Sequence, residues 1–359
     1  MENLVAAANV EAFWRGRRVF ITGSTGFKGS WLALWLARRG AIVAGYALPA
    51  AQPDDLFNSA RVQDTCPTTL ADIRDVARLT SALQDFGPQV VFHLAAQPLV
   101  RRGYANPVET FSTNVLGTCN LLDAARRVAD IEAVVVIATD KCYRNREWDW
   151  GYRETDELGG SDPYSASKAA AEIVVDCFRR SFYTAANIGL ASARAGNVIG
   201  GGDFASDRLI PDIVRAYQTD TEVVLRHPYA TRPWQHVLDC LAGYMRLAQA
   251  VTCDRNSYAQ AFNFGPNTAC ETSVLRIVDA LHRTLPVRHR IETTPRPHEA
   301  SRLALDTSLA RYKLGWRQKL TLPTTIDWTG HWYSRYLNGE NAHALAIDQI
   351  DQYEKLEYR

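Results

Sequence analysis

The stretch Arg18-Val-Phe-Ile-Thr-Gly-Ser-Thr-Gly-Phe-Lys-Gly-Ser-Trp-Leu32 decides the fold of this chain. Its β-branched and apolar start, 18–22, predicts a buried strand, and its end opens an amphipathic pattern, 26–39, that predicts a helix closed by Gly40. The glycines between them permit a tight turn and a close approach of the backbone to a pyrophosphate, which the helix N-terminus attracts. A glycine cluster can be a plain turn, but a strand before it and a helix after it favour a dinucleotide site.

The same alternation of short apolar runs and helical patterns continues along the chain. Strands are predicted at 42–46, 69–73, 90–94, 133–138 and 187–194, with helices at 76–86, 107–129 and 163–181. Continuous apolar strands between helices indicate a mainly parallel sheet that is covered on both faces. Right-handed crossovers then make it a doubly wound α/β sheet of the Rossmann type.

After about Gly196 glycines and prolines break the chain into loops. A helix at 236–251 and a strand at 261–264 are predicted to return to the sheet. We therefore expect a Rossmann domain over residues 15–195, completed by about 235–265, and a smaller C-terminal α/β substrate lobe made of 196–234 and 266–359.

Composition excludes several classes of protein. Of the 359 residues 47% are hydrophobic and 22% charged, which is ordinary globular usage and excludes a disordered or fibrous chain. The 40 basic and 39 acidic residues give a net charge of +1 without a basic block, which argues against nucleic-acid and membrane partners. Seven scattered cysteines without a C-x-x-C pair, and an N-terminus that does not read as a signal peptide, predict no metal, no disulfide framework and a cytoplasmic location.

The end of the second strand reads Gly45-Tyr-Ala-Leu48 and carries no acid to hold the adenosine ribose of NAD. This position therefore does not decide between NAD and NADP, and we expect weak binding of NAD⁺. Asp72, which follows the third strand, could face the adenine edge instead, or it could cap a helix.

A second motif, Tyr164-Ser-Ala-Ser-Lys168, opens a predicted helix after Asp162-Pro163. Tyr and Lys four residues apart lie on one helix face. An ammonium beside a phenol lowers the pKa of the phenol, so Tyr164 can remove a hydroxyl proton while a hydride leaves the same carbon. The alternative is an exposed helical pair, which the distance of the motif from the glycine loop disfavours.

Together these motifs resemble the extended short-chain dehydrogenase/reductases that act on nucleotide sugars. The glycine loop, His93-Leu-Ala-Ala-Gln97, Asn114 and the pair Tyr164/Lys168 carry the resemblance. It implies an NAD-binding Rossmann domain with a smaller nucleotide-sugar lobe. The implied cofactor contacts are Gly23, Thr25, Gly26, Phe27, Lys28, Gly29, Asp72, Ile73, Leu94, Ala95, Ala96, Asn114, Tyr164 and Lys168.

The residues at the end of the fifth strand separate the chemistries open to such a protein. Carboxyl ends of parallel strands face the crevice where ligands bind. Thr139 can hydrogen-bond the sugar O4, which suffices for an epimerase or a reductase, whereas Asp140 adds the general acid beside the C6 hydroxyl that elimination of water requires. The alternative is that Asp140 and Lys141 form a surface ion pair or start a turn.

Longer segments are similar to the branch of dehydratases in this family that act on CDP-glucose. They include Thr139-Asp-Lys-Cys-Tyr143, Gly151-Tyr-Arg-Glu154, Gly196-Asn-Val-Ile-Gly-Gly-Gly-Asp203, Arg232-Pro-Trp-Gln-His-Val237 and Pro297-His-Glu299. The resemblance implies the catalytic residues Thr139, Asp140, Lys141, Tyr164 and Lys168, with Lys141 as the C5 base by its position alone. It also implies that the sugar pocket is lined by Gln97, Arg101 and Tyr143. The implied contacts of the nucleotide, each of which could equally be a surface residue, are Asn197, Arg208, Arg232, His298 and Glu299.

The reaction that this branch implies is that of a carbon–oxygen lyase. CDP-D-glucose would be oxidised at C4, would lose water across C5 and C6, and would regain the hydride at C6, giving CDP-4-dehydro-6-deoxy-D-glucose for deoxysugar biosynthesis of the O-antigen or lipopolysaccharide type. A nucleotide-sugar 4-epimerase and a dehydratase of another CDP sugar, such as a heptose, remain open. A non-catalytic NAD(P)-binding regulator is the alternative outside the enzymes.

The two long predicted helices, 107–129 and 163–181, carry apolar residues on more than one face, including Leu121, Leu122, Ile173 and Val174. The resemblance implies that these helices pair with their copies in a four-helix interface of a homodimer. Ordinary burial against the sheet is the alternative.

Overall fold

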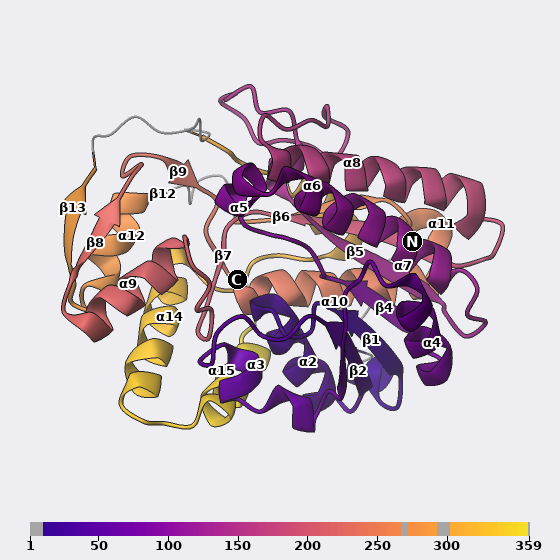
Figure 1. Ribbon diagram of the computed structural model, residues 1–359, viewed down its shortest axis with the longest axis horizontal. Helices are drawn as coiled ribbons and strands as arrows, with labels where there is room; N and C mark the ends of the chain where they lie inside the picture. Colours follow the sequence, from indigo (N-terminus) through magenta and orange to yellow (C-terminus); the bar gives the residue numbers. More distant parts are fainter. Residues whose placement is uncertain (1–9, 267–271, 293–301, 358–359) are drawn as a thin grey trace.

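A sheet of seven parallel strands forms the centre of the molecule, in the order β11-β6-β5-β4-β1-β2-β3 (Figure 1). Each of its six pairings is parallel. The computed structural model describes residues 10–266, 272–292 and 302–357. The strands of the sheet are β1 (Arg18–Thr22), β2 (Ile42–Ala47), β3 (Thr68–Leu70), β4 (Val90–His93), β5 (Ala133–Thr139), β6 (Gly189–Ala195) and β11 (Ala261–Phe264). The predicted doubly wound Rossmann sheet is confirmed, and the strand order reverses between β1 and β4.

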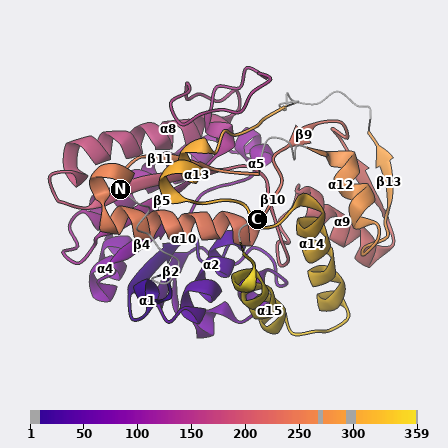
Figure 2. The ribbon, with the colours of Figure 1, turned by 180° about the vertical axis from the view of Figure 1, so that it is seen from behind.

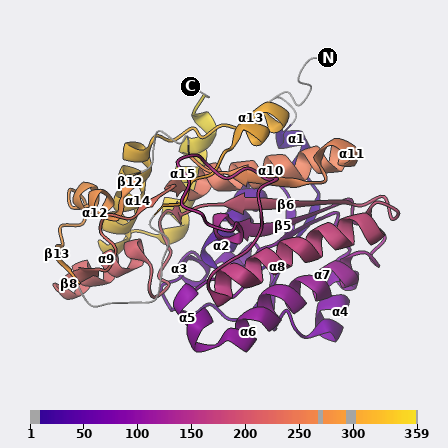
Figure 3. The ribbon, with the colours of Figure 1, turned by 90° about the horizontal axis from the view of Figure 1, so that it is seen from above.

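Helices cover both faces of this sheet, because alternate strand residues point to opposite sides. Val19 and Ile21 belong to the larger core, which α2 (Phe27–Arg38) and α10 (Val237–Cys253) cover, whereas Phe20 belongs to the other. Figure 2 shows α10 crossing the first face, and Figure 3 shows the two helical layers on either side of the strands. The second face is covered by α4 (Val76–Phe86), α7 (Gly117–Ala125) and α8 (Pro163–Phe178).

Most predicted elements lie where the sequence pattern put them. The third strand is an exception: it ends at Leu70 rather than at 73, because Asp72 already belongs to the turn before α4, where its carbonyl accepts from the Asp75 N–H at 3.0 Å. The pattern also missed α5 (Val100–Ala105). The remaining short elements are α1 (Val10–Trp14), α3 (Leu56–Ser59), η2 (Val62–Asp64), η4 (Asp140–Cys142), α11 (Arg255–Tyr258), β7 (Val198–Ile199), β9 (Thr231–Arg232), β10 (Gln235–His236) and β12 (Thr272–Ser273).

The two long predicted helices both contain a π-helical segment. The first consists of α6 (Pro107–Phe111), η3 (Ser112–Leu116) and α7, and the second continues α8 through η5 (Arg179–Tyr183). Leu121 and Leu122 are fully buried in the core, and the pairing of these two helices with their copies stays a prediction. Ile173, by contrast, is 60% exposed on α8.

Separate segments of the C-terminal half form a smaller lobe beside the carboxyl ends of the strands, on the left of Figure 1. Its parallel pair β8 (Glu222–Leu225) and β13 (Arg288–Ile291) lies with α9 (Leu209–Thr219) and α12 (Val274–Leu281). After α13 (Ser308–Leu314) and α14 (Leu322–Leu337), α15 (Ala342–Lys355) returns to the Rossmann side, where Asp351 pairs with Arg38 of α2 at 3.0 Å. Within the described residues, no helix combines the length and the hydropathy needed to cross a bilayer.

Candidate active site

A cavity of about 640 Å³ lies at the carboxyl ends of the central strands and extends into the C-terminal lobe. Its wall includes residues that follow four strands: Gly23 after β1, Leu94 after β4, Asp140 after β5 and Gly196 after β6. Because the strand order reverses beside β1, this is the position at which a doubly wound sheet binds its ligand. The cavity therefore joins the predicted cofactor loop and the predicted substrate lobe in one space.

The glycine loop is shaped by close backbone contacts that no side chain would permit. Gly23 has a φ of +74°, and a Cβ on it would lie 2.7 Å from the backbone nitrogen of Ala95. A Cβ on Gly29 would lie 2.1 Å from the carbonyl oxygen of Gly23. Gly26, at the N-cap of α2, has no side chain to bond the first-turn N–H groups, which leaves them for a ligand. The residues of this loop that line the cavity are Gly23, Thr25, Gly26, Phe27, Lys28 and Gly29, and they fit a dinucleotide pyrophosphate.

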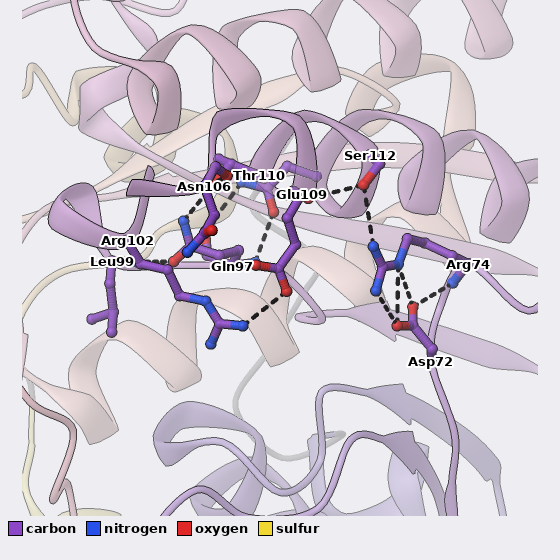
Figure 4. A network of polar contacts seen from close by, with 10 residues as sticks. Asp72, Arg74, Gln97, Leu99, Arg102, Asn106, Glu109, Thr110 and Ser112 are labelled. Atoms are coloured by element: carbon purple, nitrogen blue, oxygen red, sulfur yellow. Dashed lines mark hydrogen bonds and ion pairs between the residues drawn. The ribbon is translucent and has the colours of Figure 1, made fainter. Parts of the chain in front are cut away.

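The predicted cofactor contacts Asp72, Ile73, Leu94, Ala95 and Ala96 also line the cavity. The Asp72 carboxylate is held by Arg74 at 2.6 Å, as Figure 4 shows, and hydrogen bonds from Arg74 lower the pKa of Asp72. The helix-cap interpretation of Asp72 is wrong, because Asp75 caps α4 through the Arg78 N–H. An ionised Asp72 thus remains at the cavity wall.

Asn114 is not among the residues that line the cavity. It is buried, and its Oδ1 accepts from the Gln97 N–H at 2.8 Å while its Nδ2 donates to the Ser167 Oγ at 2.8 Å. Gln97 in turn donates to Thr110 Oγ1 at 2.9 Å within the network of Figure 4. Asn114 therefore connects the loop after β4 to α8, and its predicted direct contact with a cofactor stays a prediction.

Tyr164 and Lys168 lie on the first turns of α8, whose N-cap Asp162 accepts from the Ser165 N–H at 3.0 Å. Both side chains are buried and line the cavity, so the interpretation as an exposed pair is wrong. Burial lowers the pKa of Lys168 to about 8 and raises that of Tyr164 to about 12. The expected lowering of the Tyr164 pKa is not found: burial of the phenol, the largest influence, raises it. Lys168 Nζ donates instead to the Ile137 carbonyl at 2.8 Å.

Asp140 stands at the end of β5 with only 2% of its surface exposed. Thr139 Oγ1 donates to its Oδ1 at 2.9 Å, and its buried Oδ2 has no hydrogen-bond partner among the described residues. Burial raises the pKa of Asp140, against the opposing influence of Lys141, Thr139 and Arg232. Asp140 does open the short turn η4, but it is not a surface residue, and its raised pKa suits a proton donor.

The predicted substrate residues divide into three groups. Gln97, Arg101, Asn197, Arg208 and Arg232 line the cavity, as does Lys141 among the predicted catalytic residues. Tyr143 does not, contrary to the prediction: the turn η4 directs it into a separate buried cluster, where its hydroxyl donates to Asn263 Oδ1 at 2.7 Å. His298 and Glu299 lie outside the described residues.

Several charged residues on the lobe side of the cavity were not predicted from the sequence, among them Asp207 and Arg226. No motif marks Arg226, which simply follows β8. Asp207 has a φ of +60°, a left-handed conformation that is uncommon for a residue other than glycine. Its place directly before Arg208 was the only signal available.

The chain matches the model of the GDP-mannose 4,6 dehydratase family over residues 20–329. It is 47% identical to the CDP-glucose 4,6-dehydratase of Salmonella typhimurium over 348 residues, which cover 95% of this chain and 97% of that protein. It is 27% identical to a dTDP-glucose 4,6-dehydratase of Xanthomonas campestris, covering 87% of this chain and 92% of the relative.

Solved structures show the same fold at lower identity. A dTDP-glucose 4,6-dehydratase from Streptomyces venezuelae, with NAD and TYD bound, has a TM-score of 0.77 at 23% identity and covers 89% of this chain and 98% of its own. An epimerase from Methanothermobacter thermautotrophicus has a TM-score of 0.80 at 22% identity and covers 92% of this chain and 96% of its own. With a family match over most of its length and a relative of 47% identity, this chain belongs to the GDP-mannose 4,6-dehydratase family.

Proposed function

We propose that this chain is an NAD-dependent lyase that converts CDP-D-glucose to CDP-4-dehydro-6-deoxy-D-glucose and water. The observation that carries the proposal is Asp140: a buried carboxyl with a raised pKa and an unpartnered Oδ2, in one cavity with Tyr164 and Lys168. Oxidation at C4 needs no such acid, whereas loss of the C6 hydroxyl does. The CDP-glucose specificity rests on the 47% identical relative.

The glycine loop and the first turn of α2 would hold the NAD diphosphate, because the glycines permit a close approach and the N–H groups of the first turn are left for a ligand. NAD bound there supplies an acceptor for the hydride of C4 and a donor of the same hydride to C6. Asp72 and Ile73 would line its adenosine end, and Tyr164 and Lys168 its reactive end. Since one turnover restores the oxidised cofactor, no external reductant is consumed.

Tyr164 takes the proton of the sugar O4 hydroxyl in the first step, and Thr139 hydrogen-bonds O4. The charge of Arg208 favours the phenolate of Tyr164 against the effect of burial. Lys168 supplies a buried cation one helical turn away. These groups lie at the carboxyl end of β5 and the start of α8, which the sheet holds together.

Water is lost in the second step. A 4-ketone acidifies the proton on C5, Lys141 as a neutral amine or a neighbouring group removes that proton, and Asp140 protonates O6 as the C6–O6 bond breaks. The hydride then returns to C6 and a proton to C5, which completes the 6-deoxy sugar. Both side chains line the same cavity, and Lys141 is the more exposed of the two.

The nucleotide part of the substrate would bind on the lobe side, in residues 196–234 and in 272–292 of the later segment. Asn197, Arg208 and Arg232 line the cavity there and can donate charge-assisted hydrogen bonds to a diphosphate. Arg208 is oriented by Asp203, whose Oδ2 is 2.8 Å from its Nη1. His298 and Glu299, outside the described residues, stay predicted substrate contacts.

We place this activity in the cytoplasm and in a homodimer. The described residues include six free cysteines, which suit a reducing compartment. Apolar side chains lie exposed along one helical layer, namely Val108 at 80%, Leu116 at 57% and Ile173 at 60%. Pairing of α6, α7 and α8 with their copies in a four-helix bundle would cover them.

The test of the proposed function is a panel of CDP-, dTDP-, UDP- and GDP-glucose, each incubated with and without added NAD⁺. A 4-keto-6-deoxy product is expected from CDP-glucose in preference to the other three. Absence of a 4-keto product from CDP-glucose, or an equal rate with all four nucleotides, would contradict the proposal.

A further inference from the structure

Three charged residues from separate parts of the fold meet at the wall of the cavity, around one carboxylate oxygen. Arg101 Nη1, from α5 on the Rossmann side, lies 2.8 Å from Asp207 Oδ1. Both terminal nitrogens of Arg226, which follows β8 in the lobe, lie 3.3 Å from the same oxygen. We name this group, Arg101, Asp207 and Arg226, the Asp207 bridge. All three of its residues line the cavity.

The bridge carries a net positive charge toward the cavity, because two guanidinium groups share a single carboxylate. Its side chains are partly exposed, by 43% for Arg101, 34% for Asp207 and 29% for Arg226. Surface ion pairs of this kind contribute little to folding stability. A role in folding therefore does not explain the arrangement.

Two details of the Asp207 bridge indicate that its side chains are held in a particular orientation. Asp207 holds a left-handed backbone conformation, with a φ of +60°, which costs free energy for a residue other than glycine. The Nε atom of Arg226 is buried and has no acceptor among the described residues, so a donor is left over after Asp207 is satisfied. A strained backbone and an unused buried donor are both expected in a group of residues that binds a ligand.

We infer that Asp207 is a positioning residue that orients Arg101 and Arg226 toward the diphosphate of the nucleotide sugar. The inference rests on the proposed function for the identity of the substrate, whose diphosphate is its only anionic group. Arg101 comes from the Rossmann side and Arg226 from the lobe. The bridge would therefore keep both guanidinium groups at fixed positions on either side of the bound diphosphate. It adds Arg101 and Arg226 to the diphosphate contacts proposed above, with Asp207 as the residue that orients them.

Asp207→Asn gives a test in which positioning and simple electrostatics predict opposite signs. Removing a negative charge beside an anionic ligand should tighten binding if only charge matters. If Asp207 positions the arginines, the variant should instead raise KM for CDP-glucose about 3- to 10-fold, with kcat little changed. Asn tolerates the left-handed backbone, so the fold should survive. An unchanged or lower KM would overturn the inference.

A double-mutant comparison identifies the path of the effect. In an Arg101→Gln/Arg226→Gln background, Asp207→Asn should add less than about twofold to KM. A full additional loss there would mean that Asp207 does not act through these arginines. The matched control is Asp327→Asn, which removes a surface partner of Arg283, 2.8 Å away and outside the cavity wall, and should leave KM unchanged.

Titration with CDP separates failure of this inference from failure of the proposed function. CDP carries the diphosphate but requires no turnover. If wild-type protein does not turn over CDP-glucose, the proposed function fails, and a weaker Kd for CDP in Asp207→Asn would still support the bridge. An equal or tighter Kd for CDP would overturn it.

Discussion

Asp140 and Asp207 show how the environment gives two carboxyl groups in one cavity different tasks. Asp140 is almost fully buried, and burial raises its pKa, which favours a carboxylic acid that can give up a proton. Asp207 is partly exposed and forms ion pairs with two guanidinium groups, which suits a residue that orients them. Asp140 is therefore suited to proton transfer, and Asp207 to orienting the two arginines.

Asp140→Asn should uncouple oxidation from elimination. The amide keeps the size of the side chain but removes the proton that O6 needs, so elimination should slow by about 10²–10⁴-fold while oxidation at C4 continues. Mixed with CDP-glucose, the variant should accumulate reduced cofactor, seen as near-ultraviolet absorbance. Tyr164→Phe is the matched control, because it abolishes the first oxidation and should give no such signal. Formation of the 6-deoxy product by Asp140→Asn at the wild-type rate would reassign the acid.

Weak binding of NAD⁺ is expected from the end of β2, which offers Ala47 and Leu48 where an acid would hold the ribose. Activity of the purified protein should therefore rise on addition of NAD⁺. Leu48→Asp, at a position 54% exposed on the cavity wall, should tighten NAD⁺ binding by restoring one charge-assisted contact. A protein that is fully active and saturated as purified at low micromolar concentration would contradict this expectation.

At the scale of the elements, most strands were predictable because apolar residues dominate them. β5 is buried at all seven positions, and so is β6, which fixes the centre of the sheet. The two π-helical segments were not predictable, since no periodic pattern encodes one extra residue in a turn. Tyr143 was mispredicted for a similar reason, since no sequence pattern shows how the short turn η4 orients the residues around it. Asp140, at the start of the turn, faces the cavity, whereas Tyr143, just after it, is buried in a separate core.

Site residues that belong to a local sequence motif were predictable, whereas residues whose position depends on contacts between distant segments were not. Tyr164, Lys168 and the glycine loop lie together as their spacing requires. Asp72 was ambiguous, because an aspartate before a helix reads as a cap until its partner Arg74 is known. Asp207 could not be recognised, because its partners are about 106 and 19 residues away along the chain.

The junction between α10 and the C-terminal helices should respond to pH through Asp239. This buried carboxyl on α10 accepts from the Lys319 N–H at 2.7 Å and from the Tyr353 hydroxyl at 2.8 Å, and burial raises its pKa to about 6. A pKa above the unfolded value of 3.8 means that this group stabilises the fold most below pH 4 and that its contribution is lost as pH rises through 6. The loss is on the order of 3 kcal/mol.

Denaturant unfolding of the wild type and of Asp239→Asn, measured between pH 4 and pH 7, isolates this contribution. The difference in unfolding free energy between the two proteins should move in favour of Asp239→Asn as pH rises, because the amide does not ionise. A difference that is independent of pH would contradict the assignment.

At the scale of the whole molecule, the layer formed by α6, α7 and α8 buries one side against the sheet and leaves apolar residues exposed on its outer side. Ile173→Asp on α8 should place a charge in the proposed four-helix interface and give a monomeric mass in sedimentation at micromolar concentration. Tyr312→Asp, at an 83% exposed position on α13, is the control and should leave the dimer intact. A monomeric wild type would refute the interface.

The measurement that tests the central claim most directly follows the hydrogen on C4 of the substrate. CDP-glucose carrying deuterium at C4 should give a 4-keto-6-deoxy product with deuterium at C6, because the same hydride leaves C4 and returns after Asp140 has completed the loss of water. Mass spectrometry and NMR of the product locate the label. Deuterium that stays at C4 would identify an epimerase, and deuterium lost to solvent would show that the hydride does not return within one turnover.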